Sequence, residues 1–392
     1  MVVAAASFAC APVPGPERAV FVESRFAALP GWHTGAQGDA VPAFRRSCEV
    51  FATRPATAAI GPGGPGGIGG TVAQWRAVCR ALQAVPADDH GAARDFFERG
   101  FVTYRVSAGN DSGDGSDDGL FTGYYEPTLA GARRAGGGFT VPIYAPPPDL
   151  VTADLGRFRD DLEGLRIGGR LVARTLVPYA TRAEIADGAL AGRGLELVWV
   201  DDAVDAFFLH IQGSGRVTLR DGSVLRIGFA GSNGHPYTAI GKLLVARGAI
   251  EREHVSMQSI RAWLGAHPAK ARDIMAANAR YIFFRVRPGA GPIGAHGAAL
   301  TAGRSIAVDR RALPLGAPLW LDTSYPAADS QMPGRPLRRL MVAQDTGAAI
   351  TGAVRGDVFW GHGETAARRA GHMQQRGRYF LLLPKDVRVP GG

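Results

Sequence analysis

The chain has 392 residues, of which 46% are hydrophobic and 20% charged, so it is long and apolar enough for about two packed domains. Its formal net charge of +9 favours an acidic partner, but the basic residues are scattered and form no Lys/Arg block, which argues against nucleic acid. No apolar run reaches the length of a membrane span.

Residues 1–15, MVVAAASFACAPVPG, resemble the end of a secretory signal, because they are small and apolar and lead into proline and glycine. They lack a basic n-region, so a frayed terminus is the alternative. The stretch SFAC weakly resembles a lipoprotein cleavage box, in which Cys10 would carry a lipid that anchors the chain to the outer membrane.

Helices dominate the expected structure up to residue 105. Thr71 is expected to cap one helix, and a second is expected from Asp88 or Asp89 to Arg99. The first helix has one apolar face, formed by Val72, Trp75, Cys79 and Leu82. Cys48 and Cys79 lie in predicted helices on either side of GPGGPGG, and both a disulfide and two buried thiols remain open.

From residue 120 the sequence becomes typical of β-structure. Strands are predicted in LFTGYYEPTL, GFTVPIYAPP, LELVWVDD, DAFFLHIQGSGRVTL and VLRIGFAG, and the RDGS between the last two predicts a hairpin. An interval of about 30 residues after GFTVPIYAPP stays unassigned. Residues 237–277 return to helices, and the final third returns to strands in RYIFFRVR, SIAVDRRALPLGAPLWLD, RRLMVAQD, GDVFWG and RYFLLLP.

Acids stand at the edges of the last predicted strands, where a carboxylate is either a turn former or a functional group. A turn is favoured for Asp309, and the DTG at Asp345 is both a turn signal and similar to the aspartic-protease motif. A single DTG copy argues against such a protease. Asp357 precedes Val358, Phe359 and Trp360, and this apolar setting with an acid nearby raises a carboxyl pKa. A rise of about 3 units, or about 4 kcal/mol, would make Asp357 a general acid near neutrality.

Several motifs resemble, in the right order, those of the membrane-bound lytic murein transglycosylase A family: FTGYYEP, FFLHIQGSGRV, HPYTAIGKLL, NARYIFFR and the tail from LTAGRSIAVD to RYFLLLP. The resemblance covers about residues 120 to 385. It implies a mainly β fold with helical additions, in which residues 1–121 and 280–392 form a double-psi β-barrel domain. Residues 122–279 would form an inserted smaller β-barrel domain, with a groove for a glycan between the two.

The same resemblance implies the site residues. Asp357 matches the family's single catalytic acid, Asp345 its companion, and Asp309 the third aspartate of the motif. Substrate binding is expected from Thr122, Tyr124, Tyr125, Gln212, Gly213, Ser214 and Asp309. The family usually has D-x-G-G-A-I, whereas this chain has DTGAAI, so Ala348 puts the fine geometry behind Asp345 in question.

Side chains that could stack on sugar rings, or equally pack in the core, are Tyr124, Tyr125, Phe208 and Trp360. No cofactor is expected. No metal is expected either, since no HExxH pair occurs among His296, His362 and His372 and none of the three cysteines has metal-ligand spacing.

The activity implied is non-hydrolytic cleavage of peptidoglycan between N-acetylmuramic acid and N-acetylglucosamine, by a monomer in the periplasm or cell envelope. One alternative is a hydrolase that uses Asp345 or Glu126 as a second carboxylate. Another is a non-catalytic module that binds the cell wall, and a nucleic-acid binder is a distant third.

Overall fold

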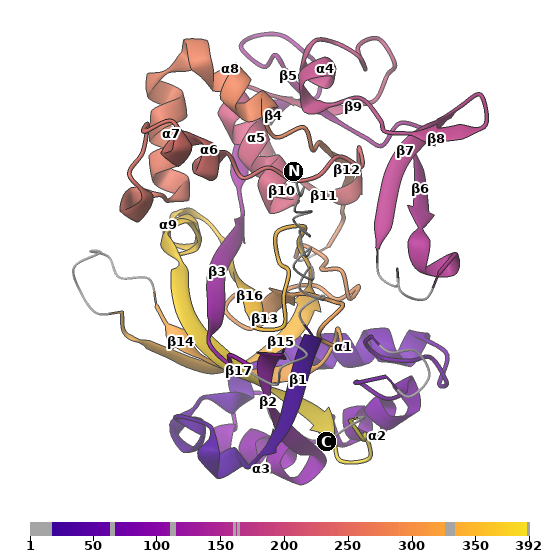
Figure 1. Ribbon diagram of the computed structural model, residues 1–392, viewed down its shortest axis with the longest axis vertical. Coiled ribbons are helices and arrows are strands. Elements are labelled where there is room, and N and C mark those ends of the chain that lie inside the picture. The colour runs from indigo at the N-terminus through magenta and orange to yellow at the C-terminus, as the bar shows by residue number, and fades with distance from the viewer. Residues whose placement is uncertain are drawn as a thin grey trace, which may run out of the picture.

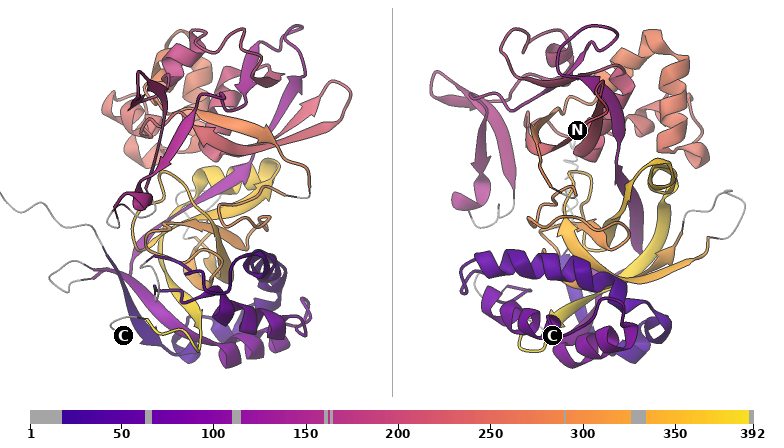
Figure 2. Two further views of the ribbon diagram at one scale, coloured as in Figure 1. Left: turned by 90° about the vertical axis from the view of Figure 1, so that its right-hand side faces the viewer. Right: turned by 180° about the vertical axis from the view of Figure 1, so that it is seen from behind.

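The computed structural model describes residues 18–62, 67–109, 115–159, 162, 165–289, 291–325 and 334–389. The predicted signal remnant and Cys10 lie outside these residues. Figure 1 shows three layers along the long axis of the molecule: N-terminal helices at one end, a β-barrel in the centre, and the middle of the chain at the other end. The view from behind in Figure 2 shows the same order.

The N-terminal layer combines helices with one antiparallel strand pair, β1 (Arg18–Ser24) and β2 (Phe101–Gly109). The helices are α1 (Val41–Thr53), α2 (Val72–Leu82) and α3 (His90–Gly100). The predicted caps are confirmed, because Thr71 forms a capping box with Gln74 and Asp89 accepts a hydrogen bond from the Ala92 amide. Helices dominate up to residue 105, as predicted, and β1 and the start of β2 are strands that the prediction did not include.

A disulfide between Cys48 and Cys79 joins α1 to α2, which settles the open choice about these cysteines. It closes a loop with a sequence separation of 31 residues. Both half-cystines are buried in the large core that α1 and α2 share with the barrel.

The barrel in the central layer consists of six described strands that form a closed ring in the order β3, β16, β13, β15, β14, β17 and back to β3. Two neighbouring pairs are parallel, β16 with β3 and β13 with β15. The bounds are β3 (Gly119–Glu126), β13 (Ser305–Val308), β14 (Pro318–Ser324), β15 (Pro336–Asp345), β16 (Arg355–His362) and β17 (Gln374–Pro384). The ring therefore combines β3, which precedes the middle part of the chain, with strands β13 to β17, which follow it.

The long last strand closes this ring. Residues 374–377 of β17 pair with β3, residues 378–381 pair with β14, and the end of the strand pairs with β2. The partner changes at Gly377, where a Cβ atom would lie only 2.5 Å from the carbonyl oxygen of Asp322. A glycine is needed here because the two backbones approach so closely. Helix α9 (Glu364–His372), which the sequence analysis did not predict, packs beside β3 and β16 (Figure 1).

The middle of the chain forms a second sheet in the order β12-β11-β10-β4-β9-β5. Its strands are β4 (Thr128–Ala132), β5 (Val141–Tyr144), β9 (Glu196–Val200), β10 (Ser214–Leu219), β11 (Val224–Ser232) and β12 (Ile282–Val286). The hairpin predicted at RDGS is confirmed, because β10 and β11 pair antiparallel. The unassigned interval contains a small sheet of β6 (Val151–Asp154), β7 (Arg166–Val172) and β8 (Thr175–Val177).

Helix α5 (Ala203–Gln212) packs on this second sheet, and further helices of the middle layer pack with α5 in a separate core. The other α-helices of this layer are α4 (Arg182–Ala186), α6 (Ile240–Ala246), α7 (Met257–Ala266) and α8 (Pro268–Ala276). Helix α5 corrects the prediction of a strand in DAFFLHIQ. Residues 206–210 are all buried, and a helix buried on every side has the same apolar run as a buried strand. Asp202 caps its start, and Gly213, in a left-handed conformation, ends it.

The prediction of a mainly β fold with helical additions is confirmed. The domain limits of 122 and 279 stay a prediction, and the strand pairing favours slightly different ones. Because β3 belongs to the barrel ring and β12 pairs with β11 of the second sheet, we propose that the inserted unit runs from about residue 127 to 286. Among the described residues, no helix is both long and apolar enough to cross a membrane.

Removing the disulfide by the double substitution Cys48→Ser/Cys79→Ser is expected to lower the free energy of unfolding by about 3–4 kcal/mol, because a closed loop of this length restricts the unfolded chain. Denaturant titration of the variant and of the wild type measures the difference. A reducing agent should destabilise the wild type and leave the variant unchanged. A difference below about 1 kcal/mol would contradict this expectation.

Candidate active site

Two aspartates face each other across one barrel strand. In the ladder of β13, Ala307 pairs with Asp357 of β16 on one side and with Asp345 of β15 on the other. Asp357 in turn pairs with Thr122 of β3. The row Thr122, Asp357, Ala307, Asp345 therefore crosses four adjacent strands, and only the small side chain of Ala307 stands between the two acids.

A register shift in β15 brings Asp345 into this row. The pairing of β13 with β15 skips Gln344, so that Ala307 meets Asp345 instead. The Gln344 side chain is fully buried and is held from the other direction, because its amide donates to the Ala43 carbonyl and to the Ser47 hydroxyl of α1. The Ser305 hydroxyl donates to Gln344 Oε1 at 2.6 Å. Helix α1 thereby fixes the position of Asp345.

Asp357 is surrounded closely by protein but keeps partial exposure. Burial raises the pKa of its carboxyl above the ordinary value, while the Arg355 charge and a hydrogen bond from Thr122 lower it. The Thr122 hydroxyl donates to Asp357 Oδ1 at 2.7 Å. No second hydrogen bond to this carboxylate comes from the part of the chain that the structure describes.

Asp345 has a richer set of donors. Its Oδ1 accepts hydrogen bonds from the Ala295 and Thr346 amides, each at 2.9 Å, and its Oδ2 accepts one from the Tyr124 hydroxyl at 2.9 Å. Burial still raises the pKa of Asp345 to about 6, the three donors lower it, and the charge of Asp357 raises it further. The pKa of Asp345 therefore lies above the ordinary value of an aspartate in spite of its three donors.

Tyr124 lies next to the two acids and packs in the apolar cluster beneath them. Its ring packs on Phe359 with the centroids 5.2 Å apart, and both belong to a small apolar cluster with Leu300, Ala307 and Ile350. Burial and the charge of Asp345 raise the pKa of Tyr124 well above its ordinary value, so its hydroxyl remains a donor. Neighbouring Tyr125 packs instead in the main core, as alternation along a strand requires.

Asp309 lies just beyond β13, and an ion pair and hydrogen bonds from the protein occupy its carboxylate. Arg311 forms an ion pair with its carboxylate at 2.8 Å, and the Gly352 amide donates to the same oxygen at 2.9 Å. Burial raises the pKa of Asp309, but these donors outweigh it and leave the pKa below the ordinary value. Asp309 holds the loop that connects the two facing acids, and its predicted contact with substrate remains a prediction.

That loop also contains Ala348, which replaces the glycine usual in the family. Ala348 is exposed, and it does not adopt the positive φ that would require glycine. The turn around it closes with a hydrogen bond from the Ile350 amide to the Gly347 carbonyl at 2.9 Å. The added methyl group is accommodated without strain.

The predicted residues of the IQGSG motif reach the barrel from the middle layer. Gln212, the last residue of α5, accepts a hydrogen bond from the Tyr125 amide through its Oε1 at 3.0 Å. Gly213 ends the helix and Ser214 begins β10. The motif therefore lies beside β3, the strand that also carries Thr122 and Tyr124.

The sequence analysis missed Tyr237 and assigned no role to Arg355. Tyr237 belongs to the HPYTAIG motif of the middle layer, and burial and the charge of Asp357 raise its pKa. Tyr237 therefore lies within electrostatic range of Asp357. Arg355 donates to Thr122 Oγ1 at 2.8 Å. Its position two residues before Asp357 on one strand was the available signal, because alternate residues share a face.

Other candidates have structural roles. Glu126 is buried, and both of its carboxylate oxygens accept from Arg226 at 2.9 Å. Phe208 and Trp360 belong to apolar cores. His296 is buried against Phe51, and burial lowers its pKa to about 4. Within the described ranges, no group of three or more His, Cys, Asp or Glu residues is arranged to hold a metal ion.

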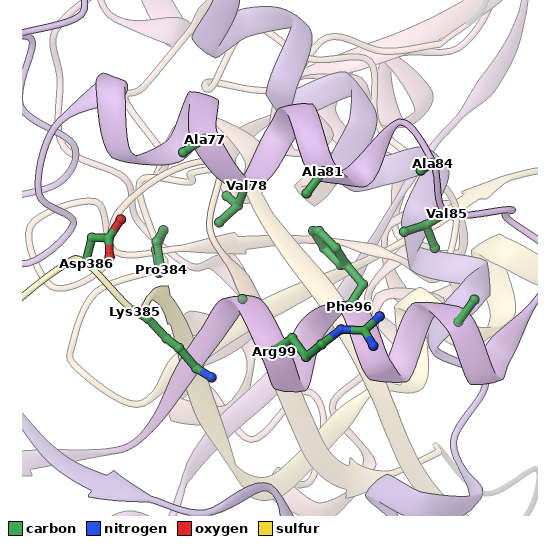
Figure 3. Close-up of a pocket in the computed structure, with 12 residues that line it drawn as sticks. Ala77, Val78, Ala81, Ala84, Val85, Phe96, Arg99, Pro384, Lys385 and Asp386 are labelled. Atoms are coloured by element: carbon green, nitrogen blue, oxygen red, sulfur yellow. The ribbon is translucent and has the colours of Figure 1, made fainter.

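A hollow of about 580 Å³ lies far from these acids, between α2, α3 and the end of β17 (Figure 3). Its lining is mostly small and apolar, with Phe96 on one side and Arg99 and Lys385 near the rim. It shares no residue with the site around Asp357. The facing acids and this hollow are therefore separate features of the molecule.

In comparisons with known proteins, two family models match, one in each part of the chain. Residues 120–285 match the model of the MltA specific insert domain, and residues 304–383 match the model of the 3D domain. Membrane-bound lytic murein transglycosylase A of Escherichia coli K12 is 34% identical over 264 residues, which cover 67% of this chain. The match spans 65% of the length of that relative.

Solved structures extend the likeness to almost the whole chain. The crystal structure of a membrane-bound lytic murein transglycosylase from Agrobacterium tumefaciens is 34% identical, with a TM-score of 0.79, and the match covers 93% of this chain and 98% of that one. The structure of E. coli MltA with bound chitohexaose is 31% identical, with a TM-score of 0.60, over 79% of this chain and 82% of that one.

The substitution Tyr124→Phe is expected to raise the pKa of Asp345 above 6 by about one unit, because it removes a hydrogen bond that favours the ionised form. Titration of the Asp345 carboxyl carbon by nuclear magnetic resonance measures the shift. Tyr125→Phe is the matched control, since this tyrosine packs in the main core, and it should leave the titration unchanged. An unchanged midpoint in Tyr124→Phe would show that the hydroxyl does not stabilise the carboxylate.

Proposed function

Because this chain belongs to the membrane-bound lytic murein transglycosylase A family, we propose that it is a peptidoglycan lytic transglycosylase. It cleaves the β-1,4 bond between N-acetylmuramic acid and N-acetylglucosamine without water. The observation that carries the proposal is the unequal hydrogen bonding of the two facing acids. Among the described residues, Asp345 has three hydrogen-bond donors and Asp357 has one.

Asp357 acts as the acid and then as the base. Burial favours its neutral form, so it donates a proton to the glycosidic oxygen as the bond to C1 of the muramyl residue breaks. The C6 hydroxyl of the same residue then attacks C1, and its proton returns to Asp357. The products are a 1,6-anhydromuramyl end and a free N-acetylglucosamine end, and the acid is regenerated.

One acid is sufficient because the nucleophile is part of the substrate. A hydroxyl tethered to the reacting sugar attacks at high effective molarity, so no second carboxylate is needed to activate water. In this mechanism Asp345 is the ionised member of the pair. The charge of Asp357 raises the pKa of Asp345, and the same repulsion, seen from the other side, favours the protonated form of Asp357. Its negative charge also stabilises the positive charge that develops on C1.

A hydrolase is less consistent with the contacts. Glu126 is not available as a second carboxylate, because Arg226 engages both of its oxygens in a buried ion pair. Asp345 accepts three hydrogen bonds, which hold it in place as a fixed charge. A base or nucleophile requires a carboxylate oxygen that is free to approach water or carbon.

We place the glycan between the barrel face and the middle layer. Tyr237 and Gln212 come from that layer and lie near Asp357 and Tyr125, respectively. The chitohexaose bound by E. coli MltA supports a substrate made of β-linked amino sugars. Contacts from Thr122, Tyr124, Tyr125, Gln212, Gly213, Ser214 and Asp309 to the sugars remain predictions.

The relatives are named as membrane-bound proteins, and this favours a location in the cell envelope. We propose that the protein acts as a monomer in the periplasm, where its substrate lies. The net charge of +9 suits the acidic peptide stems of that substrate. Anchorage through a lipid on Cys10 remains part of the proposal.

Asp357→Asn is expected to lower the rate of muropeptide release from purified sacculi by at least about a thousandfold, because an amide cannot donate and recover the proton. Mass spectrometry of the wild-type products should show 1,6-anhydromuropeptides. Asp95→Asn, at an exposed aspartate of α3, is the control for the same chemical change and should keep full activity.

The alternatives predict other outcomes of the same experiment. Reducing ends among the wild-type products would identify a hydrolase. Wild-type protein that sediments with sacculi but releases nothing soluble would be a wall-binding module. Full activity in Asp357→Asn would remove Asp357 from the mechanism.

A further inference from the structure

Arg355, Thr122 and Asp357 form a chain of hydrogen bonds on the barrel face. Arg355 Nη2 donates to Thr122 Oγ1 at 2.8 Å, and Thr122 Oγ1 donates to Asp357 Oδ1 at 2.7 Å. The direction is determined by chemistry. A guanidinium has no acceptor, so the threonine oxygen must accept from Arg355, and its one hydroxyl proton then points to Asp357.

The guanidinium is itself fixed at the junction of the two parallel strands. Arg355 Nη1 donates to the Leu120 carbonyl of β3 at 3.2 Å and also to the Gly356 carbonyl of β16. The ladder pairs Arg355 with Leu120 and Asp357 with Thr122, so arginine and acid lie on the same face of β16. The relay is therefore a built part of the β3–β16 pair and not a chance contact of a flexible side chain.

This arrangement makes the two oxygens of Asp357 unequal. Oδ1 accepts a hydrogen bond from the Thr122 hydroxyl, so a carboxylic acid with its own proton on Oδ1 would place two hydrogens against each other. No residue that the structure describes forms a hydrogen bond with Oδ2, and this oxygen is not sealed from solvent. The neutral acid therefore carries its proton on Oδ2.

We propose that Arg355 and Thr122 are positioning residues that engage Oδ1 of Asp357, so that Oδ2 alone carries, donates and recovers the catalytic proton. The proposal rests on the proposed function of Asp357 as acid and base. It assigns the Thr122 hydroxyl to the acid, whereas the sequence analysis expected it to bind substrate. When Oδ2 has lost its proton, the hydrogen bond from Thr122 and the charge of Arg355 stabilise the carboxylate that remains.

The relay should also determine the pH range of activity. Burial raises the pKa of Asp357, and Arg355 and Thr122 counteract it. Loss of the Thr122 hydrogen bond removes a contact that favours the ionised form, so the pKa of Asp357 must rise. A general acid is active below its pKa, so the alkaline limit of activity must move to higher pH by the same amount.

The test compares Thr122→Val, which keeps the shape and removes the hydroxyl, with Thr122→Ser, which keeps the hydroxyl. In Thr122→Val the titration midpoint of the Asp357 carboxyl carbon and the alkaline limb of kcat should both rise by about 1–2 units. The value of kcat at its optimum should fall at least about tenfold, with KM changed less than twofold. Thr122→Ser should restore the midpoint and most of kcat.

Arg355→Met is the second test of the relay and should move the Asp357 midpoint in the same direction as Thr122→Val. Thr128→Val, at an exposed threonine of β4, is the control for the substitution itself and should change neither quantity. The carboxyl titration does not require turnover, so an inactive wild type would refute the proposed function and still leave the relay measurable. An unchanged midpoint in Thr122→Val together with a raised KM would overturn the proposal, because Thr122 would then bind the sugar.

Discussion

Holding two carboxylates one strand apart inside a protein is the constraint on which the rest of this structure depends. Each acid resists burial, and each raises the pKa of the other. The barrel gives hydrogen-bond donors mainly to Asp345, and these donors partly offset the burial that raises its pKa to about 6. Asp357 receives one donor and retains a tendency to hold its proton. In the mechanism that we propose, this difference in hydrogen bonding, and not the identity of the residues, separates their chemical roles.

That difference depends on layers far from the acids. Helix α1 fixes Gln344, the register shift at Gln344 presents Asp345, and the loop held by Asp309 connects Asp345 to Asp357. The core under α1 and the disulfide to α2 thus contribute to the geometry of the site. On the other side, the ion pair of Glu126 with Arg226 and the contact of Gln212 with Tyr125 connect the middle layer to the end of β3.

Much of this was predictable from sequence. The apolar neighbours of Asp357 indicated a buried acid, and the DTG at Asp345 indicated a turn with backbone donors, which the Thr346 amide provides. Local signals also identified the caps at Thr71 and Asp89 and the hairpin of β10 with β11. These features depend on residues close together in the chain, where spacing carries the information.

The parts that sequence reasoning missed depend on contacts between distant segments. The donor to Asp357 comes from β3, and no local pattern shows that Thr122 pairs with Asp357. The shift at Gln344 has no sequence signature without the position of α1. The helix α5 was mistaken for a strand because an apolar run buried on all sides has no period of its own. Tyr237 was missed because its role depends on how the middle layer lies over the barrel.

The order of strands in the ring has a consequence for biosynthesis. The barrel takes β3 from before the inserted unit and its other strands from after it, and β17, the strand that closes the ring, ends at residue 384 of 392. Pairings between such distant segments form late, because a long loop must close first. A partly synthesised or partly translocated chain has β3 without β16 and cannot yet assemble its acid with the donor. The pair of Asp357 and Thr122 therefore forms only after the strands that follow the inserted unit have emerged.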